Sequence, residues 1–144
     1  MRIKDSTALV TGANGGLGKN LVAELIARGA GRVYAAARAN GQSLGEVVAL
    51  APERIVPLAL DVTDDQQVLA AARKATDITL LINNAGMMTY GAPLDVDLEL
   101  VERDLAVNFL GTLRISRAFA PVLEANGGTL VDILTAIALA PIPG

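Results

Sequence analysis

Five short runs of apolar residues recur along the chain, and stretches with helical periodicity separate them. An alternation of strands and helices predicts a parallel sheet with helices on both of its faces. Because both faces of such a sheet are buried, its strands appear as continuous apolar runs. We therefore expect an α/β fold with strands near residues 7–10, 32–36, 54–60, 78–83 and 129–134.

The first expected helix begins near Gly16 and ends at Gly29, where a left-handed residue can close it. Two later helix starts are predicted by capping-box spacing, at Ser43 with Glu46 and at Thr63 with Gln66. The apolar residues that we expect on the buried face of the first helix are Leu17, Leu21, Val22, Leu25 and Ile26.

The segment 95–126 has a long helical pattern that Asn108, Gly111 and Pro121 interrupt. It is either one bent helix or two abutting helices.

Pro57 lies inside the third expected strand and cannot donate a backbone hydrogen bond, so it predicts an edge strand. An outermost third strand fits the strand order 3-2-1-4-5 of a doubly wound parallel sheet, the Rossmann fold. We interpret residues 1–144 as one domain, because the length suits a single core.

Composition removes several classes of protein. The chain contains no Cys and no His, so we expect neither a disulfide, nor a metal site, nor a Ser-His-Asp triad. A net charge of −3 without a basic stripe argues against nucleic acid as a partner. The longest apolar stretch, residues 133–142, is shorter than a membrane span, and residues 1–5 show no apolar signal region. We therefore expect a cytoplasmic location and no membrane partner.

A glycine-rich turn, residues 11–18, follows the first strand and opens the first helix. Glycines there let the backbone approach a diphosphate, and the N–H groups at the helix start favour its charge. A P-loop is the nearest alternative, but Ala13 stands where its first glycine would be and Asn20 replaces its Ser or Thr.

The turn has the spacing Gly12-x-x-x-Gly16-x-Gly18 after Thr11, which resembles the T-G-x-x-x-G-x-G motif of short-chain dehydrogenases/reductases. Three further segments match that family's motifs: Asp61-Val62 at the end of the third strand, the N-N-A-G of residues 83–86, and Asn108. The resemblance covers the whole chain and implies the N-terminal, NAD(P)-binding part of such a domain, truncated before its C-terminal strands.

The resemblance, together with the position of these residues at the carboxyl ends of strands, gives a set of expected cofactor contacts. They are Gly12, Asn14, Gly15, Gly16, Leu17, Gly18, Arg38, Asp61, Val62, Asn84, Ala85 and Gly86. Asp61 is expected to accept a hydrogen bond from the adenine amino group, and Val62 to offer a backbone N–H.

The second strand ends at Ala36-Ala37-Arg38, with no acid to hold the ribose diol of NAD. Arg38 can pair with a 2′-phosphate instead, so the sequence favours NADP(H) over NAD.

The resemblance also implies catalytic roles for Asn108 and for Thr135, which stands where the family places a Ser at the end of the fifth strand. The family's Tyr-x-x-x-Lys pair is expected beyond Gly144, because neither Tyr34 nor Tyr90 is followed four residues later by Lys. The 144 residues alone are therefore expected to be inactive. Asp132 is unusual, since a carboxylate in a central strand needs a partner.

The hypothesis is an NADP(H)-dependent oxidoreductase that transfers a hydride between nicotinamide and a small carbonyl or alcohol substrate. The alternative is a catalytically silent dinucleotide-binding or interaction module; an S-adenosylmethionine methyltransferase would leave the N-N-A-G segment unexplained. The resemblance implies a homodimer or homotetramer formed through residues 97–123. Met87, Met88 and Tyr90 are hints of an apolar cleft wall.

Overall fold

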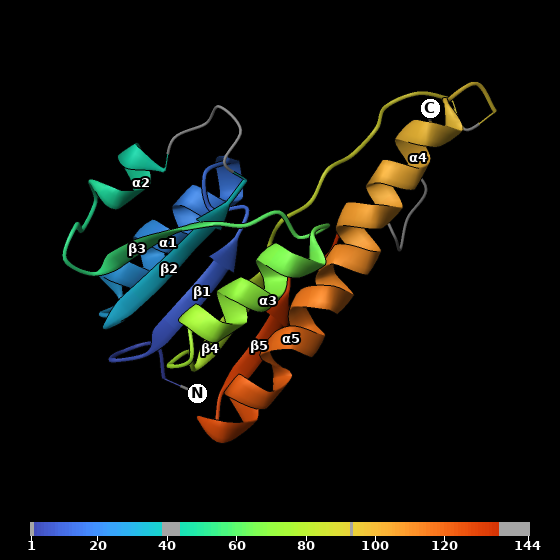
Figure 1. The fold of residues 1–144 in the computed structure, drawn as a ribbon. Helices are drawn as coiled ribbons and strands as arrows, with labels where there is room; N and C mark the ends of the chain where they lie inside the picture. The colour runs from blue at the N-terminus through green and yellow to red at the C-terminus, as the bar shows by residue number, and fades with distance from the viewer. Residues whose placement is uncertain (1, 39–43, 93, 136–144) are drawn as a thin grey trace.

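The computed structural model describes residues 2–38, 44–92 and 94–135, and its centre is a parallel sheet in the order β3-β2-β1-β4-β5 (Figure 1). The expected Rossmann topology is therefore confirmed. The strands are β1 (Thr7–Thr11), β2 (Arg32–Ala37), β3 (Ile55–Ala59), β4 (Leu80–Asn83) and β5 (Thr129–Asp132).

Helices cover both faces of this sheet and create two separate cores. One face packs against α1 (Gly16–Ala27) and α2 (Gly45–Val48), and the other against α3 (Asp65–Lys74) and α5 (Thr112–Ala125). Strand β1 supplies both cores, because Leu9 points to the α3 and α5 side while Ala8 and Val10 point to the opposite side. All three are fully buried, as the continuous apolar run predicted.

The two edges of the sheet differ. On β3, Pro57 is exposed and pairs in register with Ala35 of β2, so the edge position inferred from the missing donor is confirmed. On β5, Leu130 and Val131 remain more than a third exposed. The expectation that Asp132 would lie in a central strand is wrong, because β5 is an edge strand of the described sheet and Asp132 is exposed. Its carboxylate does have a partner, since Asn83 donates a hydrogen bond to it at 2.8 Å.

Helix α1 begins and ends where glycines were expected to bound it. Gly29 has φ +83°, its N–H donates to the carbonyl of Ile26 at 3.1 Å, and the N–H of Ala30 donates to Leu25 at 2.9 Å. These two bonds form a Schellman motif. Leu17, however, is 53% exposed, so its expected place on the buried face is wrong.

Helix α3 starts one residue later than the capping-box pattern predicted. Asp64, rather than Thr63, is the N-cap, and it accepts hydrogen bonds from the backbone N–H groups of Gln66 and Gln67. Thr63 does not cap the helix because its hydroxyl donates to Asp61. Ser43, the residue expected to cap the preceding helix, lies outside the described residues.

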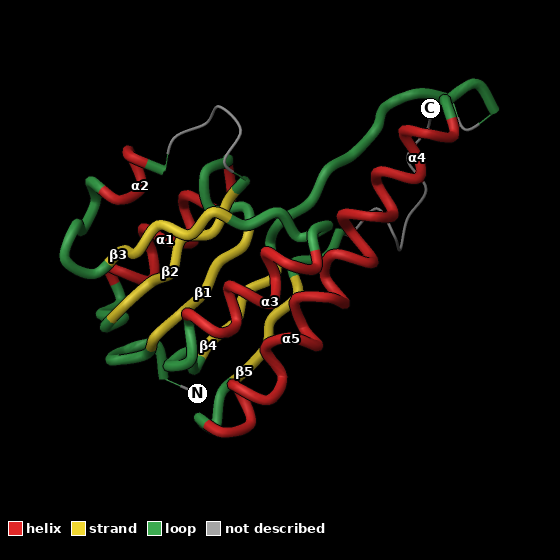
Figure 2. The backbone as a smooth tube through the Cα atoms, in the orientation of Figure 1, coloured by secondary structure: helices red, strands yellow, loops and turns green. Residues whose placement is uncertain are grey.

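The long helical segment is continuous, and its interruption is a change of helix type. After α4 (Leu98–Leu105), a π-helical turn η1 (Ala106–Gly111) leads directly into α5 (Figure 2). The turn contains Asn108, and such π segments are frequently found at functional sites. Across the described ranges, no helix is long and apolar enough to cross a membrane.

Candidate functional site

A cleft of about 630 Å³ opens at the carboxyl ends of β1, β2 and β4 and beside the turn after β3. Every expected cofactor contact except Gly16 lines it, so the fold brings together motifs from four separate segments. Four further residues line the cleft that the sequence did not assign as cofactor contacts: Ala37, Leu60, Met87 and Val107. Its size is within the range of ligand pockets.

The glycine-rich turn is held by its own close packing at two positions. Gly12 has φ +65°, a left-handed conformation that favours glycine. A Cβ on Gly18 would collide with the carbonyl oxygen of Gly12 and lie 2.8 Å from Nδ2 of Asn84. These two glycines are therefore needed for the shape of the turn itself.

Gly15 and Gly16 are different, because an added Cβ would meet no protein atom within 4 Å at either position. Packing within the chain therefore does not explain why both are glycines. The absence of side chains leaves the backbone open to an approaching ligand.

The start of α1 also lacks the partners that other helix starts have. Among the described residues, the N–H groups of Gly16, Leu17 and Gly18 have no acceptor, and no side chain caps the helix. By contrast, Asp64 caps α3 and Asp97 caps α4. The uncapped start of α1 leaves free donors and a partial positive charge at the cleft, an arrangement suited to an anion.

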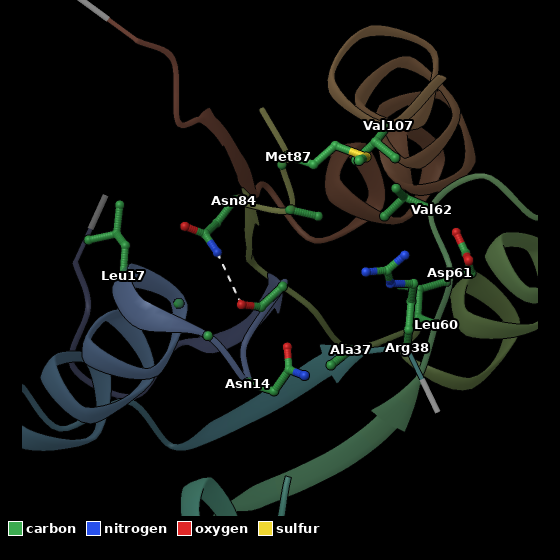
Figure 3. Close-up of a pocket in the computed structure, with 15 residues that line it drawn as sticks. Asn14, Leu17, Ala37, Arg38, Leu60, Asp61, Val62, Asn84, Met87 and Val107 are labelled. Atoms are coloured by element: carbon green, nitrogen blue, oxygen red, sulfur yellow. Dashed lines mark hydrogen bonds between the residues drawn. The ribbon is translucent and has the colours of Figure 1, made fainter. Parts of the chain in front are cut away.

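A buried hydroxyl fastens the segment after β4 to the glycine-rich turn. Thr11 Oγ1 accepts hydrogen bonds from the N–H groups of Asn84 and Ala85 at 3.0 and 2.9 Å. In return, Nδ2 of Asn84 donates to the carbonyl of Thr11 at 2.9 Å. It also donates to the carbonyl of Gly12 at 3.3 Å (Figure 3). Asn84 thus holds two walls of the cleft together, a role that its motif did not predict.

The turn after β3 leaves one donor and one acceptor without a partner. Oδ1 of Asp61 accepts from the N–H and the hydroxyl of Thr63, at 2.9 and 2.7 Å. Within the described part of the chain, the second carboxylate oxygen of Asp61 and the N–H of Val62 make no hydrogen bond. Both residues line the cleft, so this pair is available to a ligand.

Arg38 extends its guanidinium group into the space between Asn14 and Val62 (Figure 3). It is exposed, and no carboxylate of the described residues lies within ion-pair distance of it. A cation without a competing acid can bind a phosphate group bidentately.

Asn108 and Asp104 attach the segment after Gly86 to the long helix. Asn108 accepts from the N–H of Met87 at 2.9 Å and donates to its carbonyl at 2.7 Å. Asp104, which the sequence did not single out, accepts from the N–H and hydroxyl of Thr89 at 2.8 and 3.1 Å. Met87 thereby becomes part of the cleft wall, whereas Met88 and Tyr90 do not line it.

The residues expected to take part in the reaction lie outside the cleft lining. Thr135 is exposed beyond the end of β5, and Asn108 is exposed on η1. Tyr34 lies in β2, where burial and the neighbouring Asp77 carboxylate raise the pKa of its phenol. Its hydroxyl donates to Asp77 at 2.9 Å, so Tyr34 has a structural partner.

The sheet is a Rossmann fold, and the cleft lies at the carboxyl ends of its strands, where ligands bind in open α/β sheets. The sequence profile of the short chain dehydrogenase family matches residues 6–144. The chain belongs to the short-chain dehydrogenase family.

Known proteins agree with this assignment. A short chain dehydrogenase from Burkholderia cenocepacia, solved in complex with NADP, is 41% identical with a TM-score of 0.90, over 99% of this chain and 59% of that one. D-Erythrulose reductase of Gallus gallus is 38% identical over 128 residues, which are 88% of this chain and 51% of that protein. Trans-4-hydroxycyclohexanecarboxylate dehydrogenase of Sinomonas cyclohexanicum is 31% identical over 92% of this chain and 55% of its own length. The chain thus spans about half the length of these two relatives.

Proposed function

We propose that the cleft binds a nicotinamide dinucleotide, with NADP(H) preferred over NAD(H), and that it serves an oxidoreductase acting on a small carbonyl or alcohol. The proposal rests on the start of α1, where no described residue accepts from the N–H groups of Gly16, Leu17 and Gly18 and where the packing of the described residues does not require glycine at positions 15 and 16. A diphosphate would satisfy these donors and compensate the helix dipole.

The other parts of the cleft fit the remaining groups of the same cofactor. Asp61 and Val62 present an acceptor and a donor, which complement the amino group and ring nitrogen on one edge of adenine. Arg38 lines the cleft, and its guanidinium group can bind a 2′-phosphate bidentately. The related Burkholderia cenocepacia structure, which contains NADP, supports the choice of cofactor.

Bound nicotinamide would supply or accept a hydride. The described residues bind and orient the cofactor: the turn at the start of α1 holds the diphosphate, and Asn84 fixes the distance between two cleft walls. Asn108 and Thr135 are proposed to act on the substrate side. The acid–base Tyr and Lys are proposed to come from residues beyond Gly144.

Titration calorimetry with NADPH and NADH tests the proposal. We expect the chain to bind NADPH more tightly than NADH. Arg38→Ala should lower the affinity for NADPH by roughly tenfold or more and leave the affinity for NADH little changed, because only the contact with the 2′-phosphate is lost. Arg28→Ala is the matched control, since Arg28 pairs with Glu24 on α1 and does not line the cleft. Tighter binding of NADH, or an unchanged preference in Arg38→Ala, would contradict the proposed NADP preference.

The alternative, a catalytically silent dinucleotide-binding or interaction module, makes a different prediction for turnover. Cofactor binding without any absorbance change at 340 nm across a panel of ketones and alcohols would favour the module, whereas turnover would favour the oxidoreductase.

A further inference from the structure

Gln67, a residue of α3 that does not line the cleft, makes side-chain hydrogen bonds that hold the turn containing Asp61 and Val62 in place. Its Oε1 accepts a hydrogen bond from the N–H of Asp61 at 2.9 Å, and its Nε2 donates to Oδ2 of Asp64 at 2.8 Å. One amide side chain thus bridges the residue at the end of β3 and the N-cap of α3.

These contacts leave a defined set of groups for a ligand. The N–H of Asp61 is occupied by Gln67, the N–H of Thr63 by Asp61 itself, and the N–H of Asp64 by the carbonyl of Asp61. Within the described residues, the N–H of Val62 is the one backbone donor of this turn, residues 61–64, without an acceptor. The turn therefore offers a single donor next to the free oxygen of Asp61.

A donor beside an acceptor distinguishes between purine bases. Adenine has an acceptor at N1 and a donor at its 6-amino group, whereas hypoxanthine has a donor at N1 and an acceptor at position 6. Adenine therefore pairs with the Val62 N–H through N1 and with the Asp61 carboxylate through its amino group. Hypoxanthine would place a donor against the N–H of Val62 and an acceptor against the carboxylate. A site with fixed polar groups rejects a ligand that leaves those groups unpaired or opposed.

We propose that Gln67 is a positioning residue that makes this chain selective for 6-aminopurine dinucleotides, by holding Asp61 and Val62 so that their free groups face the base edge. This inference rests on the proposed dinucleotide site. Without the Gln67 acceptor, the N–H of Asp61 becomes a second unsatisfied donor, and the turn loses its attachment to α3. The acceptor and donor pair then loses its fixed alignment.

The electrostatics of the helix start agree with this geometry. The backbone N–H of Gln67, followed by its side-chain amide, lowers the pKa of Asp64 below its usual value. Asp64 therefore stays charged and keeps both contacts with Gln67 at neutral pH. Since Asp64 is also the N-cap, the bridge is anchored to the first turn of α3.

The test compares NADPH with its hypoxanthine counterpart, in which oxygen replaces the adenine amino group, by titration calorimetry on the 144-residue chain. We expect the wild-type chain to bind NADPH at least about tenfold more tightly. Gln67→Met has a similar shape but no acceptor, and should reduce this ratio roughly three- to tenfold.

Gln66→Met is the matched control, because Gln66 is the exposed neighbour whose side chain does not contact Asp61, and it should leave the ratio unchanged. A role in folding alone would lower the stability of Gln67→Met in urea without altering base preference. If Gln67→Met fails to fold, Gln67→Ser gives the same test, since its side chain is too short to reach Asp61.

The outcomes separate the two proposals. Absence of NADPH binding to the wild-type chain would overturn both. NADPH binding without base preference would overturn the role of Gln67 and leave the dinucleotide site standing. A wild-type preference that Gln67→Met retains would overturn the role of Gln67 alone.

Discussion

The region around the glycine-rich turn and the region around Asn108 and Thr135 are built differently, although both lie toward the carboxyl end of the sheet. In the first, Thr11, Asn84 and Gly18 connect the cleft walls through buried or half-buried contacts. In the second, Asn108 and Thr135 are exposed, and neither lines the cleft. The first region forms a cleft lined by described residues, and the second leaves Asn108 and Thr135, which we propose to act on the substrate side, without enclosure by the described residues.

This difference separates binding from chemistry. A dinucleotide site needs rigid backbone donors in a fixed cradle, and local packing around β1 supplies them. A reaction site needs enclosure as well as placement, because excluded water strengthens each electrostatic contact. The described residues meet the first requirement, so changes in the two regions should have unlike effects.

The largest expected effect comes from Gly18→Ala, which should reduce the free energy of unfolding by roughly 3 kcal/mol, because the new Cβ meets the Gly12 carbonyl. Gly15→Ala is the contrast: its Cβ meets no protein atom, so urea unfolding should show a loss below about 1 kcal/mol while NADPH affinity falls roughly tenfold or more. Equal stability losses, or an unchanged affinity in Gly15→Ala, would remove the distinction between packing glycines and ligand glycines.

Thr11→Val should have the next largest effect. Valine has nearly the same shape but leaves the N–H groups of Asn84 and Ala85 without their acceptor, so we expect a loss of about 2 kcal/mol in urea unfolding. NADPH affinity should also fall, since the two walls are no longer joined. Thr11→Ser retains the hydroxyl and should behave like the wild type. If Thr11→Val were as stable as the wild type and bound NADPH with the same affinity, the hydrogen bonds from Asn84 and Ala85 to the Thr11 hydroxyl would be unimportant.

The smallest effect is expected for Asn108→Ala. The change removes two hydrogen bonds to the backbone of Met87 at an exposed site, so stability should fall by about 1 kcal/mol. NADPH affinity of the 144-residue chain should change by less than about twofold, because Asn108 does not line the cleft. A large loss of NADPH affinity would place Asn108 in the binding region and weaken the comparison.

The sequence predicted the fold well where local chemistry and global topology agree. Pro57 placed β3 at an edge, and Gly29 ended α1, because each residue restricts the backbone in a way that few structures satisfy. The start of α3 was misplaced by one residue because Thr63 and Asp64 are both good caps, and only the three-dimensional position of Asp61 decides between them.

For the site, the motifs identified nearly all of the cleft lining, because strand ends meet at one edge of a parallel sheet. They did not identify Val107 as a lining residue, nor the contacts of Gln67 and Asp104. These residues lie on segments without a motif, and their contacts depend on how helices pack beside the sheet. A Gln three residues after a possible N-cap was the one available signal for Gln67.

The most direct test of the account is the response of the backbone N–H groups of Gly16, Leu17 and Gly18 to NADPH, measured by NMR on the labelled 144-residue chain. We expect these three amides to shift and to become protected from hydrogen exchange, because a diphosphate would accept hydrogen bonds from them. NADPH that binds while these amides keep their shifts and exchange rates would contradict it.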